Sequence, residues 1–498
     1  MARSLLQTST LVSLALLLSR LSGLVREQVL GARLGLSAEM DAAVLILTLP
    51  DLLVGLLLSG GFAAALVPAL TRAAPDARIQ LTRRVMGWTG LAALGLAIAL
   101  FAAMPVVLAA LAPASDLSQL AGFPLGLGLS LLALPVATII GVSSAYLNAV
   151  GKYAVPALTV LAFNGLLALY FFFGLGAGPV DFALFGLALL LASLVRFGLQ
   201  AVRMHGFARR SSGIHHFAPN FAAQFLQGVL GAALLVGMPI VFRSLYALGG
   251  PGDLATFNYA LRLFELPMGI LIAPIIMIFL PLLSAVSSAQ DPLFQQRANL
   301  AIRTAFVLGL TGALVGAIYA RPIAALLFGF GALAGDGSEA IALTIRVLLI
   351  GLPFMAVFQA LSTVLNASHR TGHVLLYSAT ALTLALGLYA VMRGGDLSVS
   401  LAAKAGFVAF SVLASGIGLH GVFGSAQMLR SLWQLCVIAL RTGAVALPFA
   451  YFWPSTRDNN LVIVDFVILG VLGLVLLAVN LPVLRELAAI RDGRSETT

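Results

Sequence analysis

The stretch LLSRLSGLVREQVLGARLGLSAEMDAAVLILTLPDLLVGLLLSGGFAAALVP, residues 17–68, is apolar enough to lie within a membrane, yet it carries several charged side chains. A charge at the centre of a membrane helix costs several kcal/mol, so it is retained where it faces a polar cavity or a partner. Arg20 and Arg26 lie six residues apart, roughly 9 Å along one helix and about 120° around it. Two guanidinium groups at this spacing fit a large anion such as a diphosphate. Alternatively, Arg26 pairs with Glu27 or extends to the membrane interface.

The composition of the whole chain is that of an integral membrane protein. Hydrophobic residues make up 61% of the 498 residues and charged residues 9%, and the mean hydropathy is +1.06. These values exclude a soluble globular protein. The net charge of +10 is explained by Lys/Arg-rich cytoplasmic loops, because no basic segment alternates with base-stacking aromatics, and no nucleic-acid partner is expected. The single cysteine, Cys436, and the scattered histidines predict no disulfide, metal or cofactor site.

Fourteen apolar runs are long enough to span a membrane. With the N-terminus in the cytoplasm, the basic loop residues gather on the inner side and the outer loops are mostly acidic. The sequence therefore predicts an all-α polytopic membrane protein with both termini cytoplasmic. The predicted spans are 5–31, 42–70, 85–112, 122–149, 153–175, 181–204, 219–248, 254–285, 298–328, 338–366, 373–392, 400–422, 431–453 and 461–487.

Two motifs recur at nearly the same offset along the chain. Leu49-Pro50 recurs as Leu266-Pro267, and Leu147-Asn148-Ala149 recurs as Leu365-Asn366-Ala367. The paired helices have the same orientation, which predicts a parallel repeat of two six-helix lobes. The predicted parts are an N-terminal lobe over 1–212, a C-terminal lobe over 213–430, and two additional helices with a short tail over 431–498.

Several motifs of the opening stretch resemble the first two helices of the MurJ/MviN family, lipid II flippases of the multidrug/oligosaccharidyl-lipid/polysaccharide exporter superfamily. These are Ser-Arg-Leu-Ser-Gly-Leu-Val-Arg-Glu (19–27), Met-Asp-Ala (40–42), Leu-Pro-Asp-Leu-Leu (49–53), Gly-Gly-Phe (60–62) and Val-Pro (67–68). Further matches follow in family order. They are Tyr-Leu-Asn-Ala-Val-Gly-Lys-Tyr-Ala-Val-Pro-Ala-Leu (146–158), Arg-Leu-Phe-Glu-Leu-Pro-Met-Gly (262–269), Leu-Pro-Leu-Leu-Ser (280–284) and Pro-Ile-Ala-Ala-Leu-Leu-Phe-Gly-Phe-Gly-Ala (322–332).

The resemblance implies a central cavity between the lobes. Its implied substrate-binding residues are Arg20, Arg26, Glu27, Asp41, Arg262 and Glu265. Plainer interpretations stay open for some of them. Arg262 and Glu265 lie three residues apart and can simply pair with each other, and Asp41 can act as a charge at a helix N-terminus. Arg243 and Lys404 match no family motif, and we expect them to extend to the interface from helix ends.

Helix-breaking residues occur at matching positions of the repeat. Pro50 and Gly60-Gly61 interrupt the second predicted span, and Pro267 interrupts the eighth. Such breaks are tolerated in membrane helices where the backbone lines a cavity or bends. We therefore expect hinges at Pro50, Gly60, Gly61 and Pro267, with simple packing as the alternative.

The sequence departs from the family pattern in two places. The second helix of the family usually reads Asn-Leu-Leu-Arg-Arg followed by an acid, where this chain has Asp51-Leu52-Leu53-Val54-Gly55 and then Ser59. Leu261 stands where an aspartate usually precedes the helix 8 arginine. The expected cavity is therefore less charged than is usual in the family, which leaves the choice of glycan more open than the mechanism.

The resemblance implies a flippase that moves undecaprenyl-diphosphate-linked lipid II from the cytoplasmic to the periplasmic leaflet of the bacterial inner membrane by alternating access. Its expected partners are this lipid, the surrounding membrane lipids and other cell-wall synthesis proteins. One alternative is a flippase for another polyprenyl-linked oligosaccharide, such as an exopolysaccharide or O-antigen unit. A membrane polymerase or ligase and a non-catalytic scaffold are further alternatives. No Walker A loop or nucleophile motif is present, so the sequence predicts a transporter and not an enzyme.

Overall fold

The computed structural model describes most of the chain as helix. The described residues are 18–19, 21–56, 66–112, 116–152, 154–175, 179–204, 237–284, 286, 291–368, 370–452 and 462–491. Within these ranges there is no strand. Ten helices of this part are long and apolar enough to cross a membrane, or eleven if a pair bent by 74° at Asn480 forms one span. The predicted all-α polytopic class is confirmed. The count of fourteen stays a prediction, because much of the first and seventh predicted spans lies outside the described residues.

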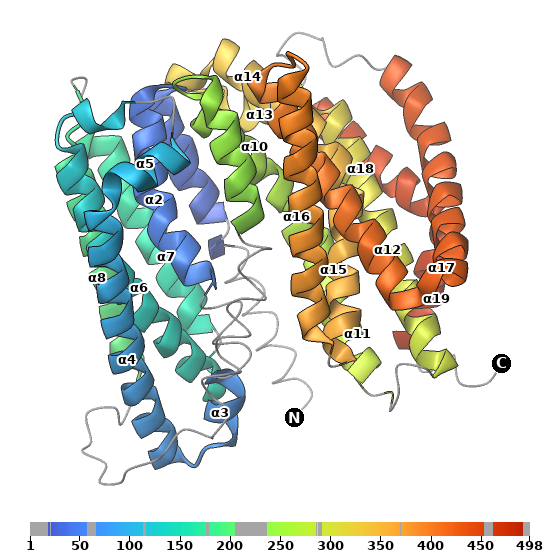
Figure 1. The fold of residues 1–498 in the computed structure, drawn as a ribbon, viewed down its shortest axis with the longest axis horizontal. Coiled ribbons are helices and arrows are strands. Elements are labelled where there is room, and N and C mark those ends of the chain that lie inside the picture. The colour runs from blue at the N-terminus through green and yellow to red at the C-terminus, as the bar shows by residue number, and fades with distance from the viewer. Residues whose placement is uncertain are drawn as a thin grey trace. The chain divides into compact units, whose positions relative to one another are not determined.

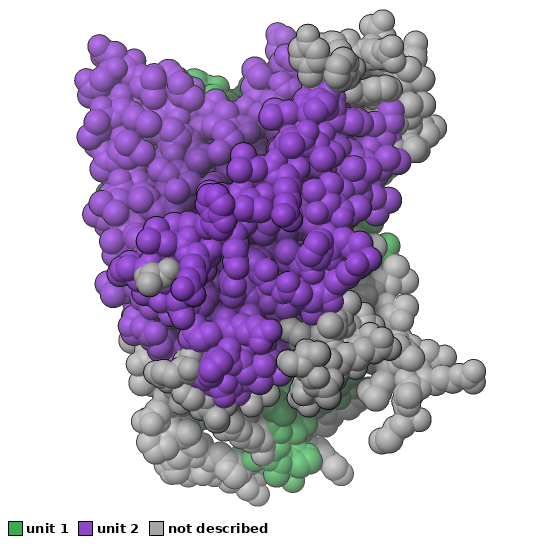
Figure 2. Space-filling model, turned by 90° about the vertical axis from the view of Figure 1, so that its right-hand side faces the viewer, with its two compact units in different colours: residues 1–255, 330–334 green, residues 256–329, 335–498 purple. Residues whose placement is uncertain are grey.

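The chain forms two compact units, which Figure 2 distinguishes by colour. Unit 1 contains residues 1–255 and 330–334, and unit 2 contains residues 256–329 and 335–498. The predicted lobe boundary near residue 212 falls in the stretch 205–236, outside the described residues. The division into the predicted lobes therefore stays a prediction.

Unit 1 is organised around α6, which packs against α2, α4 and α8 (Figure 1). Glycine permits the closest of these contacts, since a Cβ atom on Gly126 would lie 1.9 Å from the carbonyl oxygen of Phe182. The helices α6 and α8 thus cross backbone to backbone. The elements are a helix over 21–34, α2 (Ala38–Leu56), α3 (Val67–Arg72), α4 (Pro75–Ala102), α5 (Met104–Leu111), η2 (Leu117–Gln119), α6 (Phe123–Ala149), α7 (Ala154–Leu169), the π-helical turn η3 (Tyr170–Gly174), α8 (Phe182–Arg203), a helix over 237–246 and η4 (Ala247–Gly249).

Unit 2 has α12, α15 and the first part of α17 at its centre. Gly424 interrupts α17 with φ 69° and ψ 176°, which separates the predicted spans 400–422 and 431–453. The elements are α10 (Asp253–Pro267, whose first three residues belong to unit 1), the π-helical turn η5 (Met268–Ile272), α11 (Ala273–Ser284), α12 (Pro292–Ile318), α13 (Ala320–Phe328), η6 (Gly331–Leu333, in unit 1), α14 (Asp336–Leu348), η7 (Leu349–Gly351), α15 (Leu352–Ala367), α16 (Thr371–Gly394), α17 (Val399–Phe452), α18 (Val462–Val479) and α19 (Leu481–Arg491).

The bounds of these helices follow the predicted repeat. The helices α4, α7 and α8 are separated from α12, α16 and α17, respectively, by one and the same offset between first residues. This repeat offset equals the separation of Leu49 from Leu266. Both copies of the Leu-Asn-Ala motif also end their helix in the same way. The backbone N–H of Lys152 donates to the carbonyl of Leu147 over 2.8 Å, and that of Arg370 donates to the carbonyl of Leu365 over 2.8 Å. This six-residue closure satisfies a carbonyl group at the helix end.

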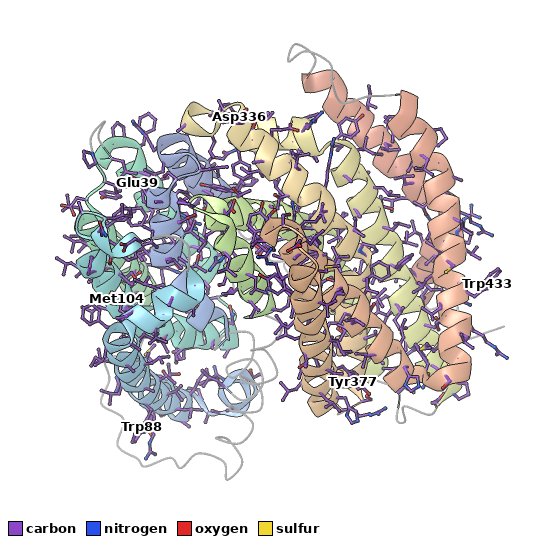
Figure 3. The ribbon with its side chains drawn as sticks, turned by 45° about the horizontal axis from the view of Figure 1, so that its top comes forward. Glu39, Trp88, Met104, Asp336, Tyr377 and Trp433 are labelled. Atoms are coloured by element: carbon purple, nitrogen blue, oxygen red, sulfur yellow. The ribbon has the colours of Figure 1, made fainter. Side chains whose placement is uncertain are left out.

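Large apolar side chains cover the outward faces of both units. Trp88 of α4 is 65% exposed and Trp433 of α17 is 70% exposed, and both point away from the helices that carry them (Figure 3). Leu91 and Ile98 extend the apolar face of α4, and Leu440 extends that of α17. Faces of this kind are stable in contact with lipid chains and not with water.

Candidate functional site

Arg26 is buried in unit 1 and is ion-paired. Its side chain is 7% exposed, and its Nη2 lies 2.8 Å from Oε1 of Glu27, whose side chain is 5% exposed. The pairing alternative is therefore present in the structure, and Arg26 does not extend to an interface. Arg20 lies outside the described residues, so its role stays a prediction.

The structure adds a residue to this pair that the sequence did not single out. Nη1 of Arg26 donates to Oδ1 of Asn164 over 3.2 Å, and Nδ2 of Asn164 donates to Oγ of Ser22 over 3.0 Å. Asn164 belongs to α7 and is buried. The available signal was an amide within an otherwise apolar helix, because a buried amide needs hydrogen-bond partners.

A second arginine on the same face of the 21–34 helix also contacts this part of unit 1. Nη2 of Arg33 donates to the carbonyl of Phe172 in η3 over 2.5 Å, and its guanidinium lies 5.4 Å from the centre of the Phe172 ring. Arg26 and Arg33 are seven residues apart, so they lie on nearly the same side of a helix. One face of the 21–34 helix thus forms hydrogen bonds with α7 and η3.

Asp41 is fully buried and binds the start of a helix far away in the sequence. Its Oδ2 accepts from the backbone N–H of Gly252 over 2.8 Å, and its Oδ1 accepts from that of Ala255 over 2.9 Å. Gly252 has φ +86°, and an added Cβ atom would lie 2.8 Å from the backbone of Leu36. Asp41 lies in the first turn of α2, as the interpretation of a charge at a helix N-terminus expects, and its carboxylate also binds the backbone at the start of α10.

Arg262 and Glu265 form the second predicted pair, on α10 in unit 2. Nη1 of Arg262 lies 3.3 Å from Oε2 of Glu265, and the two side chains are 36% and 56% exposed. The plain pairing is therefore present here as well. An exposed pair contributes little to stability, about 0–1 kcal/mol, so a stronger anionic ligand can displace Glu265 at low cost.

The predicted hinge residues differ in what surrounds them. The helix α2 continues past Pro50 to Leu56, so the structure shows no break at this proline. A proline removes one helical hydrogen bond, and the helix can resume after it. Pro267 ends α10, and the π-helical turn η5 follows it before α11. Gly60 and Gly61 lie outside the described residues.

The expectation that Arg243 extends to the membrane interface is wrong. Arg243 lies near the end of the helix over 237–246, but it is only 3% exposed, and its Nη1 donates to Oγ1 of Thr48 over 3.2 Å. It therefore does not extend to an interface. The signal that identifies it is the repeat, since Arg26 and Arg243 are separated by the repeat offset that relates the helix bounds.

The charged and polar groups of the candidate site are guanidinium, carboxylate and amide side chains, and Asn164, Arg262 and Glu265 lie on helices long and apolar enough to cross a membrane. Across the described ranges, no group of histidine, cysteine and carboxylate side chains is arranged to hold a metal ion. Guanidinium groups held by carboxylate and amide oxygens are suited to recognition of an anion.

Comparison with known proteins gives concordant results. A family model described as lipid II flippase MurJ matches residues 30–472. The chain is 27% identical over 408 residues to a probable lipid II flippase MurJ of Thermotoga maritima, a match that covers 80% of this chain and 82% of the relative. A solved lipid II flippase MurJ in an inward closed conformation has a TM-score of 0.75 at 18% identity, covering 94% of this chain and 98% of that one.

The fold extends to a wider group of transporters. An inward-facing multidrug resistance MATE family transporter of the MOP superfamily has a TM-score of 0.66 at 14% identity, covering 84% of this chain and 95% of that one. At such identities the likeness establishes the fold alone. The family model, in contrast, matches most of the sequence, and the chain therefore belongs to the MurJ family of lipid II flippases.

Proposed function

We propose that this protein moves lipid II, an undecaprenyl-diphosphate-linked saccharide, from the cytoplasmic to the periplasmic leaflet of the bacterial inner membrane. A head group of sugars and diphosphate does not cross hydrocarbon unaided, since each unpaired polar group costs several kcal/mol there. Membership of the MurJ family supports this substrate. The observation that carries the proposal is the buried Arg26–Glu27 pair inside a membrane-spanning unit.

In this proposal Arg20, Arg26 and Arg262 bind the diphosphate group. A charge-assisted hydrogen bond contributes roughly 1.5–3 kcal/mol, and a guanidinium group matches phosphate oxygens with two parallel donors. Glu27 and Glu265 hold Arg26 and Arg262 while the site is empty. A diphosphate carries more negative charge than one carboxylate, so it competes with both glutamates for the arginines.

Transport then needs movement and no chemical step. The two repeats of such transporters rock around a central site and expose it to each side of the membrane in turn. We assign Pro267 with η5, and Gly60-Gly61, as the places where helices bend. Asp41 accepts hydrogen bonds from the backbone of Gly252, just before α10, and of Ala255, in its first turn, and so fixes the start of the helix that carries Arg262.

A flippase for another polyprenyl-linked oligosaccharide is the second candidate. The segment Asp51–Gly55 favours it, because it has no arginine at the positions where the family usually has two. The diphosphate is common to both substrates, so this difference concerns the sugar part. Other cell-wall synthesis proteins are proposed partners on the same grounds as lipid II.

Complementation separates these candidates. A strain depleted of its own lipid II flippase should grow normally when this protein is supplied, and the Arg262→Ala variant at equal abundance should not restore growth. Failure of the wild-type protein, with restoration in a strain that lacks an exopolysaccharide or O-antigen flippase, would establish the second candidate.

The proposed orientation places both termini in the cytoplasm. Single-cysteine labelling in a Cys436→Ala background tests it, because Cys436 is the one natural cysteine. A cysteine at position 212 should react only with a reagent that enters the cytoplasm. Labelling at this position by a membrane-impermeant reagent from the periplasm would show that the proposed orientation is wrong.

A further inference from the structure

Asn164 extends from α7 toward the 21–34 helix, where it has three hydrogen-bond partners. Its Oδ1 accepts from Arg26, while its Nδ2 lies 3.0 Å from Oγ of Ser22 and 3.5 Å from the carbonyl oxygen of Ser19. It is 5% exposed. An amide in such a place is held by its hydrogen bonds, since leaving a buried polar group unpaired is costly.

The network fixes which way the amide points. Oγ of Ser22 donates its only hydrogen to the carbonyl of Ser19 over 2.8 Å, so this oxygen can only accept from Asn164. The Nδ2 group of Asn164 must therefore face Ser22, and Oδ1 must face Arg26. The local hydrogen bonding presents a neutral oxygen, in one orientation, to the guanidinium group.

The partners of Arg26 have unequal charge. Nη2 binds the carboxylate of Glu27 and Nη1 binds the neutral oxygen of Asn164, while buried Nε has no hydrogen-bond partner among the described residues. Of these two partners, only Glu27 carries a charge opposite to that of Arg26. If a ligand displaces Glu27, Asn164 still orients Arg26 and does not neutralise it.

We propose that Asn164 is a positioning residue for recognition of the lipid diphosphate, holding Arg26 in place through a neutral oxygen so that its charge stays available to the ligand. This inference rests on the proposed function, because it takes the diphosphate as the group that Arg26 binds. It explains why the position carries an amide. An aspartate would supply the same acceptor oxygen, but as a second carboxylate it would cancel the charge that attracts the diphosphate.

Gln200 of α8 provides a matched control in the same unit. It is a fully buried amide whose Nε2 donates to Oγ1 of Thr159 in α7 over 3.0 Å and to Oγ of Ser144 in α6 over 3.2 Å. Its Oε1 accepts from Ser143. It thus joins helices as Asn164 does, but these hydrogen bonds involve no charged side chain.

The test compares Asn164→Asp, Asn164→Ala and Gln200→Ala in the purified full-length protein. Thermal unfolding is followed in detergent with increasing undecaprenyl diphosphate, which reports stability and affinity separately. The wild-type protein should be stabilised by this lipid. Asn164→Asp loses the Nδ2 donor to Ser22 and buries a second carboxylate, so it should unfold earlier than wild type without ligand and, in addition, lose about tenfold or more in affinity. Gln200→Ala should unfold earlier and keep the wild-type affinity.

The outcomes distinguish two failures. If the wild-type protein is not stabilised by undecaprenyl diphosphate, both the proposed function and the role of Asn164 are wrong. If the wild type binds and Asn164→Asp binds equally well, only the positioning role is wrong. Asn164→Ala adds a second criterion, because it should lose affinity as well as stability, and a loss of stability alone would make Asn164 a structural residue like Gln200.

Discussion

The two halves of the repeat share their helix ends but not their interiors. The first residues of α8 and α17 are separated by the repeat offset, and both Leu-Asn-Ala motifs close with the same 2.8 Å backbone hydrogen bond. The interiors differ at equivalent positions. Gln200, Ser143 and Thr159 form a polar network in unit 1. The equivalent positions in the second half are apolar, and they are Ile417, Leu361 and Leu376, respectively.

This difference shows what the repeat requires. The helix bounds depend on backbone hydrogen bonds at the ends, which many sequences can provide. The interior depends on side chains that must fit one another. The two halves have the same helix bounds but pack these interior positions with different side chains, polar in the first half and apolar in the second. Substitutions that transfer a residue of one half into the other therefore test which features are shared.

The largest effect is expected where glycine allows backbone contact. A Cβ atom on Gly186 of α8 would lie 2.2 Å from the carbonyl oxygen of Gly126. The equivalent position in α17 is a buried alanine, Ala403. We expect Gly186→Ala to destabilise the protein by about 3 kcal/mol or more, because neither backbone can move aside. Thermal unfolding and membrane abundance measure this loss.

The control for this change lies on the same helix. Gly198 of α8 has no atom within 4 Å of its Cβ position, so Gly198→Ala should be neutral or stabilising by up to about 1 kcal/mol. If Gly186→Ala is tolerated as well as Gly198→Ala, then α6 and α8 do not cross backbone to backbone.

The two arginine–glutamate pairs should respond differently to removal of the arginine. Arg26→Ala removes one ion-pair partner of the buried Glu27 and should cost up to about 3 kcal/mol of stability. Arg262→Ala removes one side of an exposed pair and should cost at most about 1 kcal/mol. Both should lower affinity for lipid II about tenfold or more, and Arg262→Lys should restore part of it.

Separate measurements of unfolding and of lipid II flipping in proteoliposomes distinguish these effects. Normal flipping by Arg262→Ala at wild-type abundance would show that Arg262 does not bind the lipid diphosphate. Equal stability losses in the two variants would show that the Arg26–Glu27 pair is no more buried than the Arg262–Glu265 pair.

Most of the helical plan follows from the sequence, because apolar runs and helix-end motifs are local. The run 181–204 becomes α8 (Phe182–Arg203), and 373–392 becomes α16 (Thr371–Gly394). The start of α4 is the main difference, since the helix begins at Pro75 and not at residue 85. Its first turns are polar and charged, so hydropathy identifies the membrane-spanning part but not the helical extension that precedes it.

Fewer contacts of the candidate site than of the helical fold could be predicted from the sequence. The pairs Arg26–Glu27 and Arg262–Glu265 were predictable because their members are close in the sequence. The contact from Asn164 to Arg26 joins residues 138 apart, and the contacts of Asp41 with Gly252 and Ala255 join residues still farther apart in the chain. Such partners are chosen by packing in three dimensions, and neither composition nor periodicity contains that information.

A moderate effect is expected from moving an apolar side chain of the second half into the polar network of the first. Gln200→Ile places at this position the residue found at 417. Ser143 and Thr159 would lose a partner, but each also donates to a carbonyl of its own helix. We therefore expect a loss of only about 1–2 kcal/mol, measured by thermal unfolding. A loss as large as that of Gly186→Ala would mean that the network specifies the fold of unit 1.

The smallest effect is expected at a helix end, where the two halves agree. Gly151 follows α6 with φ +78°, and no atom lies within 4 Å of its Cβ position. A substitution to alanine therefore meets no steric clash, and its cost is the strain of a left-handed backbone, about 1 kcal/mol. The second Leu-Asn-Ala motif is followed at the equivalent position by a histidine, His369, so the same place in the second half carries a side chain. We expect Gly151→Ala to lower the unfolding temperature slightly and to leave flipping unchanged, because the closure from Lys152 to Leu147 is made by backbone atoms alone. A large loss of flipping at normal stability would instead show that this turn moves during transport, which would give the first half a function at this helix end beyond simple closure.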